Sequence, residues 1–305
     1  MKGLLILGSD GMVGSRFVDL EASDKQPFLP RSEELDITSK DSVADYLSKH
    51  RDEIKTIVNF AAFTDVGEAE NQRGDKKGDC WQINVEGAIN LTSAIKDTDI
   101  RLIQISTDMV FSGSKDDPGP YTEERRPEKD PDKVTWYGFT KGEGERIITK
   151  ELGEKATILR IIYPVRAHFK KKLDYLRFPL KLFDEEKLYP VFTDQQVSIS
   201  FIDEVCKALV NIIDEKQTGV FHAGSSDIGT PFEIISYLIE KARDKRGVVK
   251  KTTLEEFITT TNASPIRYPK FGGLSVSKTE EKLGIEFSTW KQIVEKIASE
   301  LGNLK

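Results

Sequence analysis

Short hydrophobic runs alternate with amphipathic stretches through the first half of the chain. The runs that have the length and composition of strands are residues 3–7, 27–29, 56–62, 101–106 and 156–161. The stretches whose apolar residues recur with helical spacing begin after Gly11, at residue 41, at about Cys80 and near Tyr137. Strands that alternate with helices predict a doubly wound parallel α/β sheet, with right-handed crossovers and helices on both faces.

The regular alternation of strand-like and helical patterns ends after about residue 163. One strand-like run follows at residues 219–223, and helical patterns follow at 202–213, 231–243 and 290–301. We therefore expect a first domain over residues 1–163 and a smaller, helix-rich C-terminal lobe over residues 164–305. Some segments of the second region should return to the first domain.

A long loop rich in proline and charge spans residues 113–133, just before the helix that holds Tyr137. Such loops are usually solvated surface segments, but a loop of this length beside a functional site can also cover a substrate. Both interpretations remain open from the sequence.

The composition narrows the class of protein. The chain has 305 residues, 38% of them hydrophobic and 31% charged, and a formal net charge of −6. This mixture is typical of a soluble globular protein, and it gives no basic surface for nucleic acid and no membrane span. Two cysteines far apart in sequence favour free thiols in the cytoplasm, and the three histidines lack metal-ligand spacing. A homodimer is retained as an option.

Three glycines follow the first predicted strand directly. Gly8, Gly11 and Gly14 in "LLILGSDGMVGSRF" can form a tight turn and let a pyrophosphate approach the backbone at the start of the next helix. This order of strand, glycine turn and helix predicts a Rossmann-like dinucleotide-binding domain. Arg31, which follows the second predicted strand, favours NADP over NAD because a base there can accommodate a 2′-phosphate. NAD remains an alternative.

Two tyrosine–lysine pairs share the same spacing. Tyr137 and Lys141 follow a strand that ends in "QISTD", whereas Tyr237 and Lys241 lie in an amphipathic stretch with no such strand ahead. Since the carboxyl ends of parallel strands line the crevice of an open sheet, the first pair should lie with Thr107 near a bound cofactor. We expect the second pair to be structural.

The motifs "GSDGMVG", "VNFAAFTDVGEAE", "INVEGAINLT", "STDMVFSG" and "YGFTKGEGE" resemble the extended short-chain dehydrogenase/reductase superfamily, and most closely dTDP-4-dehydrorhamnose reductases. The resemblance implies an NAD(P)H-dependent reductase of a nucleotide-activated 4-keto-6-deoxysugar, in which Tyr137 supplies a proton and Thr107 holds the substrate oxygen. A free tyrosine has a pKa of about 10, so this exchange calls for a lowered pKa. Lys141 and the positive nicotinamide ring are the charges that could lower it.

The resemblance also assigns individual residues. The catalytic residues are Thr107, Tyr137 and Lys141. The cofactor-binding residues are Gly8, Asp10, Gly11, Met12, Val13, Gly14, Arg31, Asp36, Ile37, Ala61, Ala62, Phe63, Asn84, Tyr137, Lys141 and Tyr163. The substrate-binding residues are Thr107, Asp108, Met109, Tyr163 and Gln195. No metal site is implied.

Met109 stands where related dehydratases carry glutamate, which disfavours dehydration. It also stands where reductases usually carry tyrosine, and Tyr163 stands where they carry tryptophan. Two other functions fit the same resemblance: an epimerase that holds NAD tightly, and a non-catalytic subunit similar to the regulatory β subunit of methionine adenosyltransferase.

Overall fold

A computed structural model describes residues 3–22 and 25–302 of the chain. These residues divide into two compact units, each assembled from separate stretches of sequence. Unit 1 comprises residues 1–110, 126–160 and 206–221, and unit 2 comprises residues 111–125, 161–205 and 222–305. The change from unit 1 to unit 2 after residue 110 was not predicted. The change after residue 160 falls three residues before the predicted boundary at 163.

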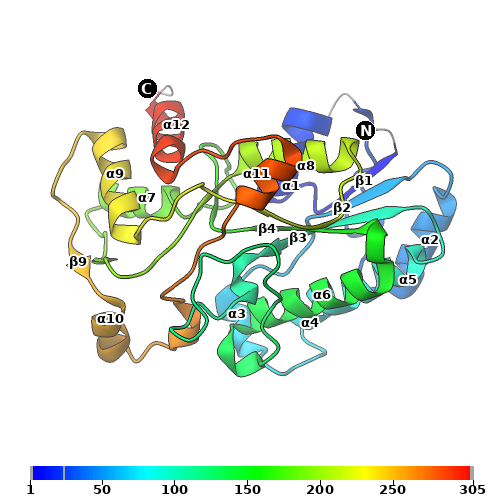
Figure 1. Ribbon diagram of the computed structural model, residues 1–305, viewed down its shortest axis with the longest axis horizontal. Coiled ribbons are helices and arrows are strands. Elements are labelled where there is room, and N and C mark those ends of the chain that lie inside the picture. The colour runs from blue at the N-terminus through cyan, green and yellow to red at the C-terminus, as the bar shows by residue number, and fades with distance from the viewer. Residues whose placement is uncertain (1–2, 23–24, 303–305) are drawn as a thin grey trace. The chain divides into compact units, whose positions relative to one another are not determined.

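A five-stranded sheet forms the centre of unit 1 (Figure 1). Its strands, in spatial order, are β1 (Leu4–Leu7), β2 (Thr56–Asn59), β3 (Arg101–Thr107), β4 (Ala156–Ile161) and β8 (Gly219–Ala223). The pairs β1–β2 and β2–β3 are parallel, with Leu4 opposite Thr56 and Thr56 opposite Arg101. Nearly continuous burial along these strands explains their uninterrupted hydrophobic runs.

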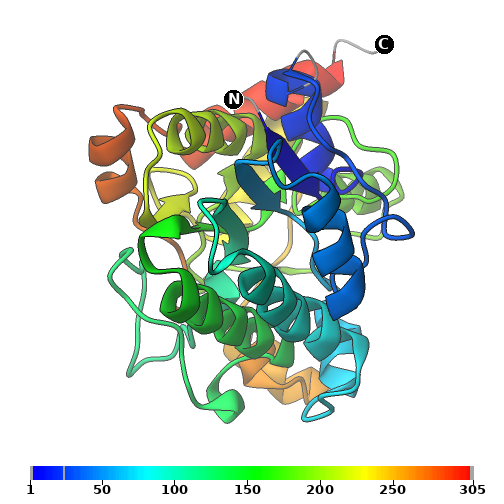
Figure 2. The same cartoon turned by 90° about the vertical axis from the view of Figure 1, so that its right-hand side faces the viewer.

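Helices cover both faces of this sheet. On one face α6 (Trp136–Leu152) packs on α5 (Gly87–Ile95), which packs on α2 (Lys40–Lys49), so the three form one layer (Figure 2). On the other face lie α1 (Met12–Phe17) and the part of α8 (Ile202–Asp214) that belongs to unit 1 (Figure 1). This arrangement confirms the predicted doubly wound parallel α/β fold.

Two predicted elements of unit 1 differ from the structure. The strand expected at 27–29 is a single bridge, in which Phe28 pairs with Leu5 at the open edge of β1. The helix expected from Cys80 to Lys96 begins as α4 (Asp79–Trp81), passes through a π-helical turn at residues 82–86 and continues as α5. A short helix that was not predicted, α3 (Val66–Asn71), starts where the Asp65 carboxylate caps it.

Unit 2 is built mainly from helices around its own hydrophobic core. Its helices are α7 (Arg177–Asp184), α9 (Pro231–Arg243), α10 (Leu254–Thr261), α11 (Ser277–Leu283) and α12 (Trp290–Gly302). Two short parallel pairs join β5 (Pro164–Val165) to β7 (Ser200–Phe201) and β6 (Val191–Phe192) to β9 (Lys251–Thr252). The apolar faces of α9 and α12 pack against each other.

The first part of the predicted long loop is an integral piece of unit 2. Its backbone pairs with residues 271–275: Gly119 N donates to Phe271 O at 2.7 Å, and Tyr121 N donates to Gly273 O at 2.9 Å. The Glu123 carboxylate accepts from both the backbone N and the hydroxyl of Thr279, at 3.0 and 2.7 Å. Residues 111–125 are therefore held in place by sequence-distant partners, which a solvated loop would lack.

Candidate functional site

The glycine turn between β1 and α1 is shaped by two close backbone contacts. Gly8 has a φ of +69°, and a Cβ there would lie 2.7 Å from Ala61 N; a Cβ on Gly14 would lie 2.4 Å from Gly8 O. Neither position can carry a side chain without moving backbone. At Gly11 a Cβ would meet only Gly8 O, at 3.3 Å. Packing thus explains two of the glycines, whereas the open side of Gly11 fits close approach by a dinucleotide.

The residues expected to bind the adenosine end of the cofactor lie in different environments. Arg31 is exposed, and its guanidinium has no ion-pair partner within residues 3–22 and 25–302. The Asp36 carboxylate is used locally, where it accepts from the backbone N and hydroxyl of Thr38. Ile37 is buried in the unit 1 core, and its carbonyl accepts from Asn90. Of these residues, Arg31 has the side chain best placed to meet an anionic ligand.

Asn84 connects the exit of β2 to α6. Its Oδ1 accepts from Phe63 N at 3.0 Å, and its Nδ2 donates to the hydroxyl of Thr140 at 3.0 Å. The side chain is only 7% exposed. Asn84 therefore positions the segment that contains Ala61, Ala62 and Phe63, and this structural role accounts for its amide without a cofactor contact.

Thr107 and Tyr137 are brought together by the start of α6. The hydroxyl of Thr135 caps the helix by accepting from Gly138 N at 3.1 Å. A Cβ on Gly138 would lie 1.9 Å from Met109 O, so only glycine allows the first turn of α6 to dock on the turn that follows β3. As a result Thr107, at the end of β3, lies beside the Tyr137 phenol, and the Thr107 hydroxyl donates to the Asp108 carboxylate at 3.1 Å.

The protein alone raises the pKa of Tyr137 well above its usual value. Burial of the phenol is the main cause, and the negative charge of Asp108 adds to it, while the hydrogen bond from Thr107 acts in the opposite direction. In the chain by itself, desolvation outweighs the hydrogen bond from Thr107, and the lowering of this pKa by Lys141 and the nicotinamide ring stays a prediction.

Lys141 lies one helical turn after Tyr137 on the same face of α6. Its ammonium is 5% exposed and donates to the backbone carbonyl of Ile105 at 2.7 Å. Burial lowers the pKa of Lys141 to about 8, although the carboxylate of Glu145 favours the charged form. The carbonyl thus orients the cation beneath the carboxyl end of β3.

A buried ion pair that the sequence did not reveal anchors α6 to the sheet. The guanidinium of Arg160 on β4 contacts the carboxylate of Glu145 on α6 at 2.7 Å, and the two side chains are 2% and 4% exposed. Glu145 lies one turn beyond Lys141. The "GEGE" stretch gives no signal of this pair, because neither burial nor a partner fifteen residues away can be read from local spacing.

The second tyrosine–lysine pair has a different environment. The Tyr237 hydroxyl donates to the Glu295 carboxylate, Lys241 pairs with the same carboxylate at 3.4 Å, and the Tyr237 ring packs edge-on against Trp290. These contacts join α9 to α12 at the surface of unit 2.

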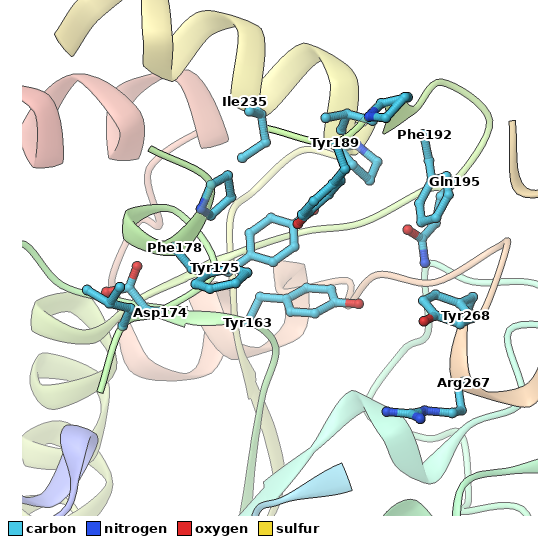
Figure 3. Close-up of a pocket in the computed structure, with 15 residues that line it drawn as sticks. Tyr163, Asp174, Tyr175, Phe178, Tyr189, Phe192, Gln195, Ile235, Arg267 and Tyr268 are labelled. Carbon is cyan, nitrogen blue, oxygen red and sulfur yellow. The ribbon is translucent and has the colours of Figure 1, made fainter. Parts of the chain in front are cut away.

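Tyr163 and Gln195 line one cavity of unit 2, with a volume of about 380 Å³ (Figure 3). Its aromatic and polar lining also includes Asp174, Tyr175, Phe178, Tyr189, Phe192, Arg267 and Tyr268. The rings of Tyr163 and Tyr175 stack at a centroid distance of 4.3 Å, and Tyr163 has a φ of +38°. That backbone conformation is costly for a tyrosine, which is typical of residues at binding sites. Several of these aromatic residues were missed because they are spread over residues 163–268.

No group of three or more histidine, cysteine, aspartate or glutamate side chains suited to a metal ion occurs in the described part of the chain. Within the same residues, no helix is both long enough and apolar enough to cross a bilayer. Cys80 and Cys206 are buried, and neither forms a disulfide.

Comparison with known proteins gives a consistent result. The family model for the RmlD substrate binding domain matches residues 1–303. A dTDP-4-keto-6-deoxy-D-glucose reductase from Streptomyces niveus is 29% identical over 231 residues, which cover 75% of each chain. A dTDP-4-dehydrorhamnose reductase from Aggregatibacter actinomycetemcomitans is 24% identical and covers 97% of this chain and 98% of its own.

Solved structures share the fold over almost the whole chain. A dTDP-4-dehydrorhamnose reductase from Bacillus anthracis, in complex with NADP, superposes with a TM-score of 0.82 at 24% identity and covers 98% of this chain and all of its own. A dTDP-4-dehydrorhamnose reductase from Clostridium acetobutylicum has a TM-score of 0.80 at 25% identity and covers 98% and 99% of the two chains.

Proposed function

We propose a function from the premise that this chain belongs to the RmlD substrate binding domain family, whose model matches nearly its full length. The protein is an oxidoreductase of the short-chain dehydrogenase/reductase type that uses NADP(H). It reduces the C4 ketone of a nucleotide-activated 4-keto-6-deoxysugar, and a dTDP-linked sugar is the substrate we propose. The observation that carries this function is the convergence of Thr107, Tyr137 and Lys141 at the end of β3.

NADPH, when bound, supplies the hydride for the ketone carbon. The chain's own residues hold the ketone oxygen and deliver a proton to it. The hydroxyl of Thr107 donates to the Asp108 carboxylate in the free chain, and it turns to donate a hydrogen bond to the ketone oxygen as negative charge develops there. The phenol of Tyr137 then gives its proton to this oxygen, which becomes the hydroxyl group of the product. A donor must be protonated at the start, and the raised pKa of Tyr137 keeps it so near neutral pH.

Lys141 contributes a fixed positive charge. Its pKa of about 8 leaves most of the ammonium charged at pH 7, and the Ile105 carbonyl fixes its position. An ammonium one turn from the tyrosine favours the phenolate that forms after proton transfer. At the other end of the proposed cofactor site, the open side of Gly11 accommodates the pyrophosphate, and Arg31 is the residue we propose for the 2′-phosphate.

Two alternatives share the same fold. An epimerase would need the same tyrosine and a tightly held NAD, and a regulatory subunit would need neither turnover nor substrate. The names of the curated relatives favour the reductase, since both of the relatives compared above are called reductases. The cytoplasm is the compartment we propose, because neither of the two buried cysteines forms a disulfide.

The decisive test is NADPH oxidation with a dTDP-4-keto-6-deoxysugar by the wild type, Tyr137→Phe and Tyr237→Phe. Tyr137→Phe keeps the ring and removes the exchangeable proton, so turnover should fall by about 10²- to 10⁴-fold. NADPH affinity, measured by calorimetry, should change little. Tyr237→Phe is the matched control and should retain turnover, because its hydroxyl only joins α9 to α12.

Full turnover by Tyr137→Phe would refute the assigned proton donor. If the wild type turned over no 4-keto sugar nucleotide and bound a synthetase tightly, the regulatory function would replace the enzymatic one. Bound NAD that copurifies with the protein, together with interconversion of sugar epimers, would support the epimerase.

A further inference from the structure

We propose that Glu145 is a positioning residue for the reaction: clamped by Arg160, its carboxylate keeps the Lys141 ammonium charged and in place beneath the carboxyl end of β3. This inference rests on the proposed function for the role of Lys141. It depends on the burial of the three side chains, on the neutral partner that Lys141 has on the sheet, and on the geometry of the ion pair.

Lys141 lies in surroundings that work against its charge. The residue is 5% exposed. Burial lowers its pKa to about 8, and among the groups that act in the opposite direction Glu145 has the largest effect. Proton transfer from Tyr137 leaves a phenolate, which an ammonium stabilises and a neutral amine does not. Some other part of the chain must therefore keep this lysine protonated.

The partner of Lys141 on the sheet is neutral. The ammonium donates to the carbonyl of Ile105 at 2.7 Å, and the same carbonyl accepts from the Gln104 amide at 2.9 Å. The Gln104 amide oxygen in turn accepts from the Asn59 amide on β2 at 2.8 Å. Two donors thus share the two lone pairs of one carbonyl. This arrangement orients the ammonium, but a negative charge must come from elsewhere.

The nearest titratable groups come from α6 and α4. On α6, Tyr137 lies one turn before Lys141 and Glu145 one turn after it. On α4, the Cys80 thiol favours the charged lysine only when it is ionised, and burial raises the pKa of that thiol. Burial also raises the pKa of Tyr137. Of these groups, Glu145 is the source of negative charge at neutral pH.

The other elements packed on α6 add no charge aimed at the lysine. The helix α5 has no titratable side chain. On α3, Glu70 pairs with Arg73 at 2.9 Å, and in the π-helical turn Glu86 accepts from the Trp81 indole at 3.1 Å. The charge of Asp108, after β3, acts on the catalytic tyrosine. These carboxylates serve other partners, so the effect on the lysine falls to Glu145.

The clamp on Glu145 is bidentate. The Nε atom of Arg160 donates to Oε1 at 3.0 Å and Nη2 donates to Oε2 at 2.7 Å. A buried carboxylate without a partner tends to take up a proton. A guanidinium keeps its charge at every accessible pH, so a carboxylate held in its fork stays ionised. Arg160 thus secures the charge that acts on Lys141.

Anchoring alone gives no reason for charges at this place. Apolar residues of similar volume often replace a buried ion pair with no loss of stability. They would fasten α6 to β4 as well as Arg160 and Glu145 do. A charged pair one helical turn from a buried lysine is explained by its effect on that lysine.

The test follows the protonation of Lys141 by NMR of the cofactor-free, full-length protein with isotope-labelled lysine. The Lys141 signal is assigned by its absence in Lys141→Arg, and in wild type its midpoint should lie near pH 8. Glu145→Gln should lower the midpoint by about 1 pH unit or more, because the remaining guanidinium repels the ammonium. Arg160→Gln should raise the midpoint, because the carboxylate is then left without an opposing charge.

The opposite signs separate this role from anchoring. Both variants break the same ion pair, so a pair that only anchors α6 would move the midpoint in the same direction in both, or in neither. Either result would overturn the inference. Glu145→Asp keeps the charge and should restore most of the wild-type midpoint. Glu143→Gln is the matched control and should leave the midpoint unchanged, because Glu143 is a partly exposed residue of the same helix that pairs with Arg146.

A variant that does not fold is recognised by circular dichroism and by a lysine midpoint near the unfolded value of about 10.4. If Glu145→Gln does not fold, the double variant Glu145→Gln/Arg160→Met removes both charges of the pair and leaves neither unpaired. Its midpoint should still fall, by less than in the single variant, since the repulsion from Arg160 is gone too. An unchanged midpoint in the folded double variant would count against the inference.

Turnover judges the proposed function separately. The alkaline limb of the pH profile of NADPH oxidation should follow the Lys141 midpoint, toward lower pH in Glu145→Gln and toward higher pH in Arg160→Gln. The expected NMR shifts without any turnover refute the function alone. Turnover with a Lys141 midpoint that neither variant moves refutes this inference alone.

Discussion

Asp108 follows the proposed catalytic threonine, and its carboxylate accepts from the Thr107 hydroxyl at 3.1 Å. Burial raises the pKa of Asp108 to about 7, although hydrogen bonds from Thr107 and the backbone lower it. The carboxyl group therefore changes its charge near neutral pH. When it is ionised, it raises the pKa of Tyr137 further.

Asp108→Asn should make the folded protein more stable than wild type at pH 8, and this advantage should disappear near pH 4. In wild type the unfolded carboxyl ionises at about pH 4 and the folded one at about pH 7, so stability is lost as pH rises through that interval. Each unit of difference between the two pKa values corresponds to about 1.4 kcal/mol. Denaturant unfolding at several pH values measures the effect.

Asp116→Asn is a suitable control, because Asp116 is exposed on the segment of residues 111–125, where a substitution should change the free energy of unfolding little. A stability difference between Asp108→Asn and wild type that stayed constant from pH 4 to pH 8 would contradict the assignment.

The proximity of Thr107, Tyr137 and Lys141 was predictable from the sequence, but their electrostatics were not, and their catalytic roles stay predictions. The order of motifs along the chain pointed to Tyr137, Lys141 and Thr107 and away from Tyr237. The direction of the pKa shift at Tyr137 depends on how much water the fold excludes, which no local pattern encodes. Gln195 was expected to bind substrate, but its partner Pro269 lies 74 residues later and could not be foreseen.

At the scale of elements, the turn from β1 to α1 holds glycines required for packing and a glycine proposed for cofactor binding within residues 8–14. Gly14 packs against Gly8 O, whereas Gly11 faces an open side. Two substitutions in one turn can therefore report on two different properties.

Gly14→Ala should lower the free energy of unfolding by about 1–3 kcal/mol, because its methyl group would lie 2.4 Å from Gly8 O. Gly11→Asp should change stability much less and should reduce NADPH affinity by about 10-fold or more, since it places a side chain and a negative charge against the pyrophosphate. Thermal unfolding and calorimetric titration measure the two effects. Unchanged NADPH affinity in Gly11→Asp would refute the proposed cofactor site.

Long periodic elements of the fold were predicted well. β1, β3 and β4 are buried on both faces and read as continuous apolar runs, and α9 has a proline and a capping box at its start. The two-residue strands β5, β6, β7 and β9 were missed, because pairs this short depend on partners brought together by the fold. The π-helical turn at residues 82–86 was missed for a similar reason, since its residues satisfy the ordinary helical pattern.

At the scale of the whole chain, each unit is completed by segments that lie far apart in sequence. Residues 206–221 include the first part of β8, the neighbour of β4 in the sheet. All six residues of β4 are buried. The sequence pattern could suggest two regions. Which segments join which unit depends on long-range pairing and could not be predicted from local patterns.

A fragment of residues 1–163 should therefore fail to fold cooperatively. It lacks residues 206–221, so the edge of β4 would be exposed, and it carries residues 111–125 without their partners in unit 2. Circular dichroism should show no sharp thermal transition for the fragment and a clear one for the full chain. A soluble fragment that melts sharply and binds NADPH would contradict this expectation.

The pairing of residues 111–125 also bears on how the protein is made. Glu123 and its partner Thr279 are 156 residues apart, and ribosomes add about 5–20 residues per second. The nascent chain must therefore wait about 8 to 30 s after Glu123 is added before Thr279 exists. During that time Tyr121, which is buried in the native protein, stacks on Phe111 but lacks the backbone partners that Gly273 and Leu274 provide. The segment before α6 is thus a candidate for chaperone binding while translation is still under way.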